Sequence, residues 1–214
     1  MDVMQLRRNL LMQRVSGGLP AEYQQIEWIQ STGTQYIATN YVPGNNLKVN
    51  LKYSFASQLP NDKNDELFFG ARDDSSERIW VEVYLQTRCY CANGYSGYRN
   101  VLNGVGLSLN TVHSFYMDNE IMSVDNNTVS KTTDYSNPDL PIHIFGWNHN
   151  GTHDYTSSVL RIHELKFSEG NNISANFVPC VRKADGEPGM YDTVSKTFYT
   201  NAGTGEFIIP DSTN

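Results

Sequence analysis

Short segments in which apolar and polar side chains alternate run through the chain from Leu19 onward. Alternation with a period of two predicts β-strands with one buried face, and the Gly, Asn and Asp residues between the segments predict tight turns. The expected strands are residues 24–29, 35–39, 47–55, 66–72, 78–90, 112–118, 120–125, 142–147, 158–167 and 173–182. Many short strands without intervening helical segments are typical of an all-β, two-sheet antiparallel sandwich, which we expect to span residues 19–214.

Residues 1–18 follow a different pattern. Val3, Leu6 and Leu10 recur at the spacing of one helix face. Asp2 can cap the first turn, and a Ser-Gly-Gly run ends the segment. A helix this short is marginally stable in water unless its apolar face is covered. The pattern therefore predicts a short N-terminal helix that either docks on a partner or a second copy of the chain, or packs on its own sandwich.

The expected strand 78–90 has two contrasting faces. Ile79, Val81 and Val83 form an apolar face, so the intervening positions point the other way. These positions combine flat aromatic rings with charged groups: Arg78, Trp80, Glu82, Tyr84, Arg88 and Tyr90. Aromatic rings stack on the C–H faces of sugars, while charged side chains form hydrogen bonds with hydroxyl groups. The pattern is compatible with a saccharide platform, and equally with a loop or an edge segment that covers these aromatics and so makes a second, smaller core.

Two turn-rich stretches add candidate ligand contacts. Tyr95, Tyr98 and Arg99 stand among Gly, Ser and Asn residues, a mixture that combines rigid rings with adaptable polar groups. Trp147 and His149 come directly before an Asn-Gly turn. Both stretches can serve as ligand-contacting loops, and both can equally be ordinary hairpins that lie on the sandwich or in solvent.

The composition limits the function classes. The chain has 214 residues, with 16 Lys+Arg against 23 Asp+Glu and a formal net charge of −7, which excludes duplex nucleic acid and anionic lipid as default partners. No apolar run approaches the roughly 20 residues that a membrane-spanning helix requires, so we expect no membrane insertion. Of the 3 cysteines, Cys89 and Cys91 lie too close together on one strand for an unstrained disulfide, which predicts free thiols.

The sequence lacks the signatures of several enzyme classes and metal sites. Glu82 stands alone on its strand, whereas a β-sandwich glucanase needs closely spaced carboxylates. His163-Glu164 lacks the second His of a zinc protease. Residues 62–66 resemble the start of a calcium loop in which Leu67 replaces the required Gly. We therefore expect no catalytic residue, no cofactor and no designated metal ion.

The two ends of the sandwich resemble a known family. Residues 19–39, LPAEYQQIEWIQSTGTQYIAT, are similar to the opening of a family of proteins encoded by phages and prophages of gut bacteria. Residues 177–207, which contain the runs Asp-Gly-Glu-Pro-Gly and Asn-Ala-Gly-Thr-Gly, are similar to its closing signature. Members of that family have concanavalin A-like, laminin-G-like jelly-roll domains. The resemblance implies a virion appendage or surface-adhesion module, made in the bacterial cytoplasm and located in the phage particle.

Two functional hypotheses follow. In the first, the chain is a non-enzymatic tail, baseplate or head-fibre module that binds cell-surface glycans of the host through the residues named above. In the second, it is a purely structural virion component that decorates or joins other parts without binding sugar. In both, residues 1–18 are expected to contact other virion proteins or to assemble a homotrimer, by analogy with phage appendages.

Overall fold

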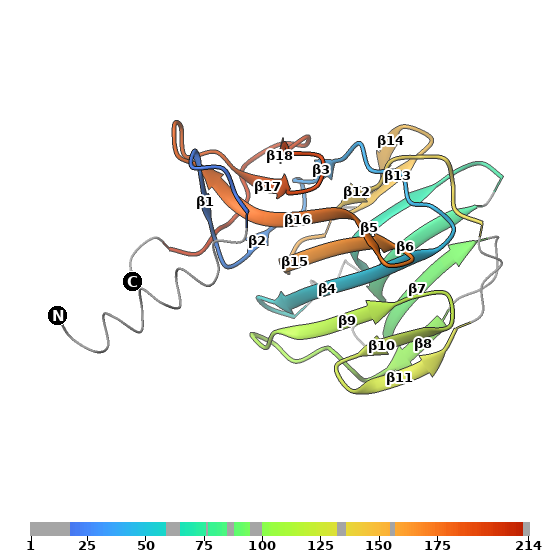
Figure 1. Ribbon diagram of the computed structural model, residues 1–214. Coiled ribbons are helices and arrows are strands. Elements are labelled where there is room, and N and C mark those ends of the chain that lie inside the picture. The colour runs from blue at the N-terminus through green and yellow to red at the C-terminus, as the bar shows by residue number, and fades with distance from the viewer. Residues whose placement is uncertain are drawn as a thin grey trace.

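The computed structural model describes residues 18–58, 65–75, 77–84, 88–94, 100–131, 136–154 and 157–211. Within these ranges the chain forms two β-sheets that pack face to face, as Figure 1 shows. The prediction of an all-β, two-sheet sandwich is confirmed. Residues 1–17, where the N-terminal helix is expected, lie outside the described ranges, as do Tyr95, Tyr98 and Arg99. In the part that is described, no helix is long and apolar enough to cross a membrane.

One sheet, called the large sheet below, has the order β11-β10-β9-β4-β15-β16-β17-β18, with β2 beside β15 and β1 beside β16. Its strands are β1 (Tyr23–Gln25), β2 (Ile29–Gln30), β4 (Leu47–Phe55), β9 (His113–Met117), β10 (Ile121–Val124), β11 (Asn127–Ser130), β15 (Leu160–Glu169), β16 (Asn172–Arg182), β17 (Pro188–Asp192) and β18 (Thr197–Thr200). The long strands β4 and β15 pair antiparallel at its centre.

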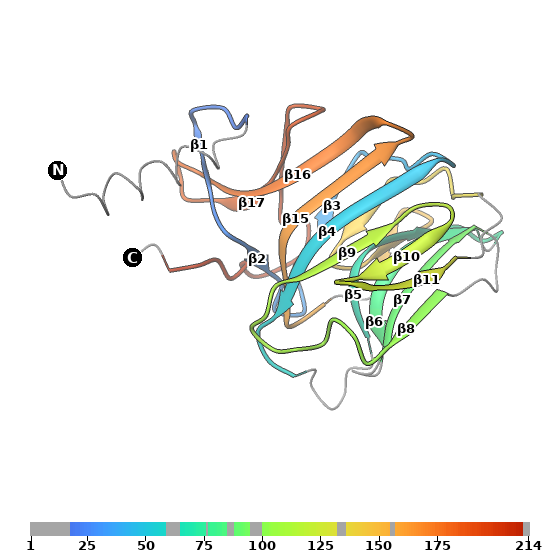
Figure 2. The ribbon, with the colours of Figure 1, turned by 60° about the horizontal axis from the view of Figure 1, so that its bottom comes forward.

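The other sheet, called the small sheet, has the order β14-β13-β5-β6-β7-β8, with β12 between β3 and β5. Its strands are β3 (Ile37–Ala38), β5 (Asp65–Arg72), β6 (Arg78–Tyr84), β7 (Arg88–Gly94), β8 (Asn100–Asn103), β12 (His143–Ile144), β13 (Trp147–His149) and β14 (Thr152–Asp154). β13 runs parallel to β5, whereas the other pairings in this sheet are antiparallel. Figure 2 gives a second view of the two layers.

The segment predicted as one strand, residues 78–90, is a hairpin. β6 and β7 pair antiparallel, with Trp80 opposite Ala92 and Glu82 opposite Tyr90. The prediction of a single strand is wrong because odd-numbered residues face the core in both arms of the hairpin. The alternation of buried and outward residues therefore gives no sign that the chain reverses direction. The expected strand 142–147 likewise divides into β12 and β13 at Phe145, whose φ of 67° turns the chain.

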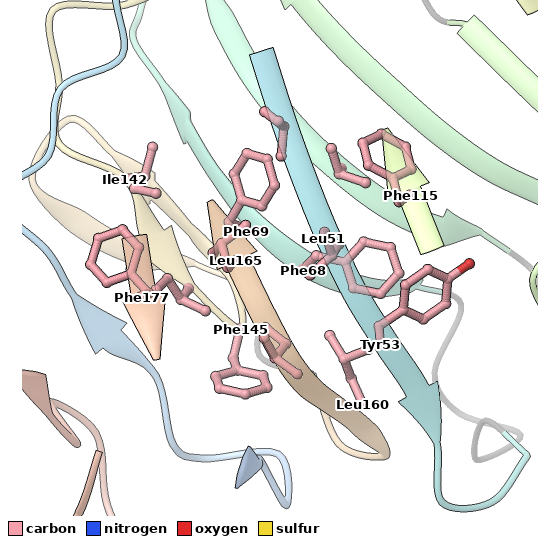
Figure 3. Close-up of a cluster of buried hydrophobic side chains, with 14 of the residues drawn as sticks. Leu51, Tyr53, Phe68, Phe69, Phe115, Ile142, Phe145, Leu160, Leu165 and Phe177 are labelled. Carbon is pink, nitrogen blue, oxygen red and sulfur yellow. The ribbon is translucent and has the colours of Figure 1, made fainter. Parts of the chain in front are cut away.

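Aromatic and aliphatic side chains of both sheets fill the space between the layers. The largest fully buried rings, several of which Figure 3 labels, are Tyr53, Phe68, Phe69, Phe115, Phe145, Phe167 and Phe177. On β4, alternation turns Leu47, Val49 and Leu51 toward this core. Tyr53 follows them, and its hydroxyl donates to the carbonyl of Gly106 at 3.0 Å. Gly106 has a φ of 71°, and a Cβ there would collide with that hydroxyl, so this turn requires glycine.

Cys89 and Cys91 on β7 and Cys180 on β16 are buried free thiols. Burial raises the pKa of Cys91 and of Cys180 to about 12. Burial also raises the pKa of Cys89 well above its ordinary value. The thiols therefore stay protonated at neutral pH, where they are poor nucleophiles. The prediction of free cysteines is confirmed.

A buried carboxylate ties the two sheets together at one end of the core. Glu66 on β5 is 0% exposed. Its carboxylate accepts hydrogen bonds from the backbone N–H and the hydroxyl of Ser158, both at 2.8 Å, and from the Val159 N–H at 3.2 Å. These charge-assisted hydrogen bonds offset the cost of removing a carboxylate from water. Because Ser158 and Val159 lead into β15, Glu66 fixes where the chain enters the large sheet.

Candidate functional site

The outer face of the large sheet carries a polar hollow of ≈ 270 Å³. The hollow lies over β4, β9, β10 and β15, whose apolar side chains point to the core on the opposite face. The residues that line it are Asn50, Leu51, Lys52, Ser114, Phe115, Tyr116, Ser123, Asp125, Glu164 and Lys166. We take this hollow as the candidate ligand site because it is a depression with several convergent hydrogen-bonding groups.

Strand alternation and one β-bulge place these side chains. Asn50 and Lys52 alternate with the core residues of β4 and therefore face outward. On β15 the register with β4 shifts between Ile162 and Glu164, so the bulge turns both His163 and Glu164 away from the core. The outer face of β15 thereby gains an additional polar side chain directly beside the hollow.

Glu164 lies between two lysines in the hollow. Its Oε2 is 3.0 Å from Lys52 Nζ, and its Oε1 is 3.3 Å from Lys166 Nζ. Partial burial by itself raises the pKa of Glu164, but the hydrogen bonds and charges of Lys52 and Lys166 outweigh burial and hold this pKa below its ordinary value. The carboxylate is therefore ionised at neutral pH, and it holds two ammonium groups in place as hydrogen-bond donors.

Tyr116 on β9 supplies an aromatic ring to the hollow. Its hydroxyl donates to Asp118 Oδ2 at 2.8 Å. Burial, together with this hydrogen bond, raises the pKa of Tyr116 to about 12, so the phenol is neutral. A half-buried ring with an anchored hydroxyl loses little conformational freedom when a ligand stacks on it.

Asp125, directly after β10, is the second carboxylate of the hollow. Its Oδ1 accepts a hydrogen bond from the Ser114 N–H at 3.0 Å, and its Oδ2 lies 2.9 Å from His113 Nδ1. Glu164 is ionised at neutral pH, and Asp125 accepts hydrogen bonds from neighbouring donors, so both carboxylates can accept hydrogen bonds from a ligand.

The face on which the sequence predicted a saccharide platform is buried in the structure. Trp80 is 2% exposed and Glu82 is 6% exposed. Trp80 packs edge to face against Trp147, with ring centroids 5.3 Å apart, and Leu67 belongs to the same cluster. Gly70 lies opposite Trp80, and a Cβ there would crowd both tryptophans, so glycine permits this packing. The prediction that Trp80 and Glu82 are exposed is wrong, and the alternative that the sequence left open, a second small core, is what the structure shows.

The remaining described residues of the predicted platform and its neighbouring loop lie on β6, β7 and β13: Arg78, Tyr84, Arg88, Tyr90, Trp147 and His149. The guanidinium of Arg78 lies 5.1 Å from the centre of the Trp80 ring. His149 Nε2 is 3.5 Å from Asp74 Oδ1. The structure thus gathers Arg78, Trp80 and Trp147 into a packed cluster. Alternation indicates which positions share a face, but it does not indicate whether another segment covers that face.

None of the residues that line the hollow was among the predicted contacts. One signal was present in strand 47–55, whose outward positions hold Lys48, Asn50 and Lys52 between apolar residues. Apart from Leu51 on the same strand, the other lining residues lie on β9, β10 and β15 or directly after β10, and the order of the strands in the sheet brings them together.

A second polar cluster lies on the small sheet. The Nδ1 atoms of His143 and His153 are 3.2 Å apart, and the ring of Tyr36 stacks on His153 with centroids 3.5 Å apart. Burial lowers the pKa of both histidines to about 4, and for His153 the neighbouring His143 adds to this effect. Both imidazoles are therefore neutral at pH 7, so one Nδ1 can donate to the other. Across the described ranges, no three or more His, Cys, Asp or Glu side chains gather as a metal site.

Comparisons with known proteins add little to this geometry. No protein-family model matches the chain, and no curated protein matches it. Among solved structures, the chain is similar to the Ruminococcus gnavus IT-sialidase CBM40 bound to α2,3-sialyllactose, with a TM-score of 0.47 and 7% sequence identity. The match covers 65% of this chain and 90% of that chain. A likeness at this level bears on neither the site nor the ligand.

Proposed function

We propose that this chain is a non-enzymatic glycan-binding module of a phage virion appendage, with a concanavalin A-like jelly-roll fold, and that the hollow on the large sheet is its binding site. The observation that carries the proposal is the lining of the hollow, which combines two lysines, two carboxylates, an amide, two serines and a tyrosine. Hydroxyl-rich ligands need this mixture of donors and acceptors beside an aromatic ring.

The size and order of the hollow support a single sugar ring as its occupant. Pockets for drug-sized ligands measure roughly 300–1,000 Å³, and the hollow, at ≈ 270 Å³, lies just below that range. Lys52, Glu164 and Lys166 already hold one another in place, so little side-chain ordering remains for the ligand to impose. Preorganised polar groups favour recognition of hydroxyl groups over recognition of an apolar ligand.

The role in a virion rests on the resemblance at the two ends of the chain. It favours a tail, baseplate or head-fibre protein that is made in the bacterial cytoplasm and located in the phage particle. Residues 1–18 would attach it to other virion proteins or assemble a homotrimer. Light scattering of the full chain and of a variant that lacks residues 1–18 tests the assembly. A trimer that becomes a monomer supports it, whereas an unchanged number of copies per particle contradicts it.

A glycan-binding screen with the purified full chain, followed by calorimetric titration, tests the binding site. Lys52→Ala and Tyr116→Ala should each weaken glycan binding by at least about tenfold, the effect of losing one good polar contact or ring contact. Lys48→Ala is the matched control, because Lys48 lies on the same strand outside the hollow. Unchanged binding in both hollow variants refutes this site, and failure to bind any glycan favours the purely structural virion role.

A further inference from the structure

Arg161 presents an oriented guanidinium on the same face as the hollow. It lies on β15, three residues before Glu164, and Figure 1 shows β2 beside this end of the strand. The guanidinium carbon is 4.1 Å from the centre of the Trp28 ring, and Nε donates to Gln30 Oε1 at 3.0 Å. Gln30 is itself only 6% exposed. A stacked ring and a buried amide oxygen together fix the plane of the guanidinium.

Arg161 differs from the lysines of the hollow in its charge pairing. Lys52 and Lys166 share Glu164 as their ion-pair partner. Arg161 forms no ion pair with any residue in the ranges that the structure describes. Because Gln30 occupies Nε, the two terminal Nη groups are the donors that remain for a ligand.

Charged groups of both signs lie near the imidazole that neighbours Arg161. His163, two residues along β15, has its Nε2 2.9 Å from Ser54 Oγ. Burial lowers the pKa of His163, so this imidazole is neutral at pH 7. Among the charged groups that act on the same imidazole, Glu27 has the largest effect and raises its pKa, whereas Arg161 and Lys52 lower it. Glu27 therefore acts in the same neighbourhood as Arg161, but no carboxylate of the described residues forms an ion pair with the Arg161 guanidinium.

We propose that the glycan is acidic, and that its carboxylate binds the Nη groups of Arg161 while a neighbouring sugar ring occupies the hollow. This inference rests on the proposed function. A guanidinium offers parallel N–H donors that match the two oxygens of a carboxylate. Because of the bulge, Arg161 and Glu164 pair with Ser54 and Lys52, which are about 7 Å apart along β4, and Arg161 lies outside the lining of the hollow. We therefore place the carboxylate and the ring in the hollow on neighbouring sugar units. The ligand class is therefore an oligosaccharide that contains a uronic or ulosonic acid.

Matched glycans on the full-length protein test this proposal. The probe is an array of bacterial-surface oligosaccharides printed in pairs, each uronate or ulosonate beside its carboxyl-reduced form. The wild-type protein should prefer the acidic member by at least about tenfold, as expected for charge-assisted hydrogen bonds. Arg161→Gln should abolish this preference, and Arg161→Lys should retain part of it because it keeps the charge and loses the planar fork. The uronate and ulosonate pairs distinguish the two sources of the carboxylate.

Arg182→Gln is the matched control, because Arg182 also lies over an aromatic ring, that of Phe198 at 5.3 Å, but pairs with Asp185 outside the hollow. It should keep the preference for acidic glycans. If Arg161 has only a structural role, Arg161→Gln weakens the binding of the acidic and the carboxyl-reduced glycan equally. An unchanged ratio of the two affinities in Arg161→Gln therefore overturns the inference. Equal binding of both members by the wild type also overturns it, while the proposed function stands. Failure to bind any member of the array refutes both.

Discussion

Replacing Trp80 by alanine tests whether the outer face of the small sheet is a covered core. The indole is 2% exposed and packs with Leu67 and Trp147. The substitution removes a buried ring, its edge-to-face contact with Trp147 and its contact with the guanidinium of Arg78.

The expected loss is a few kcal/mol. Truncation of a buried Trp or Phe to Ala typically costs about 3–5 kcal/mol. An edge-to-face ring pair contributes about 0.5–1.5 kcal/mol of this and a cation–π contact about 0.5–1 kcal/mol. Because Trp80 belongs to a small cluster that can partly collapse, we expect a value near the lower end, about 3 kcal/mol. In a domain of this size, that loss lowers the melting temperature by about 6–12 °C.

Thermal melting followed by circular dichroism, together with urea unfolding, measures the loss. Trp28→Ala is the control, because Trp28 is half-buried and should cost about 1 kcal/mol or less. Glycan binding by Trp80→Ala should stay unchanged once the protein is folded. A fall of less than about 2 °C, combined with loss of glycan binding, would refute this reasoning and return Trp80 to the exposed platform that the sequence suggested.

Further substitutions and one pH titration probe other parts of the fold. Glu66→Gln should lower the free energy of unfolding by about 1.5–3 kcal/mol, because it loses charge-assisted hydrogen bonds; an unchanged urea midpoint contradicts this. Gly106→Ala should cost about 1–3 kcal/mol and more than Gly151→Ala, where φ is also positive but nothing lies within 4 Å; equal urea midpoints contradict this. Because His143 and His153 have a folded pKa of about 4, against 6.5 ordinarily, the unfolded chain binds more protons between these values. The free energy of unfolding should therefore be highest above pH 6.5 and fall as the pH is lowered toward 4. In His143→Phe it should fall less steeply with pH. Urea unfolding that gives the same pH dependence for both proteins contradicts this.

The sequence predicts strands best where one face is buried and turn residues mark both ends. The expected strand 47–55 coincides with β4, because its apolar residues alternate without a break. Prediction fails at residues 78–90, where two arms of a hairpin share one phase of alternation. It also misses β11, whose four residues are mostly exposed and hold a single apolar side chain, Val129. A strand of that kind is defined by its neighbours in the sheet, which a local pattern does not identify.

The candidate site could not be predicted, because it is built from single outward positions on separate strands. Lys52 and Lys166 are far apart in the sequence and share Glu164 because β4 pairs with β15. The bulge between Ile162 and Glu164 sets which side chains of β15 face outward. A regular alternation of apolar and polar residues cannot predict it. Strand order and register depend on contacts between residues far apart in the sequence, and they determine which side chains meet in the candidate site.

The outer faces of the two sheets differ in how much free energy their burial would cost, and the candidate site lies on the face that is costlier to bury. On the small sheet, outward positions hold Trp80 and Trp147, and covering large rings stabilises the fold. On the large sheet, the hollow holds Lys52, Glu164 and Lys166, whose charges would lose hydration if another segment covered them. Folding therefore favours covering the first face and leaving the second open to water. A polar ligand can compete with water on the open face, where preformed charges and the ring of Tyr116 already provide its contacts.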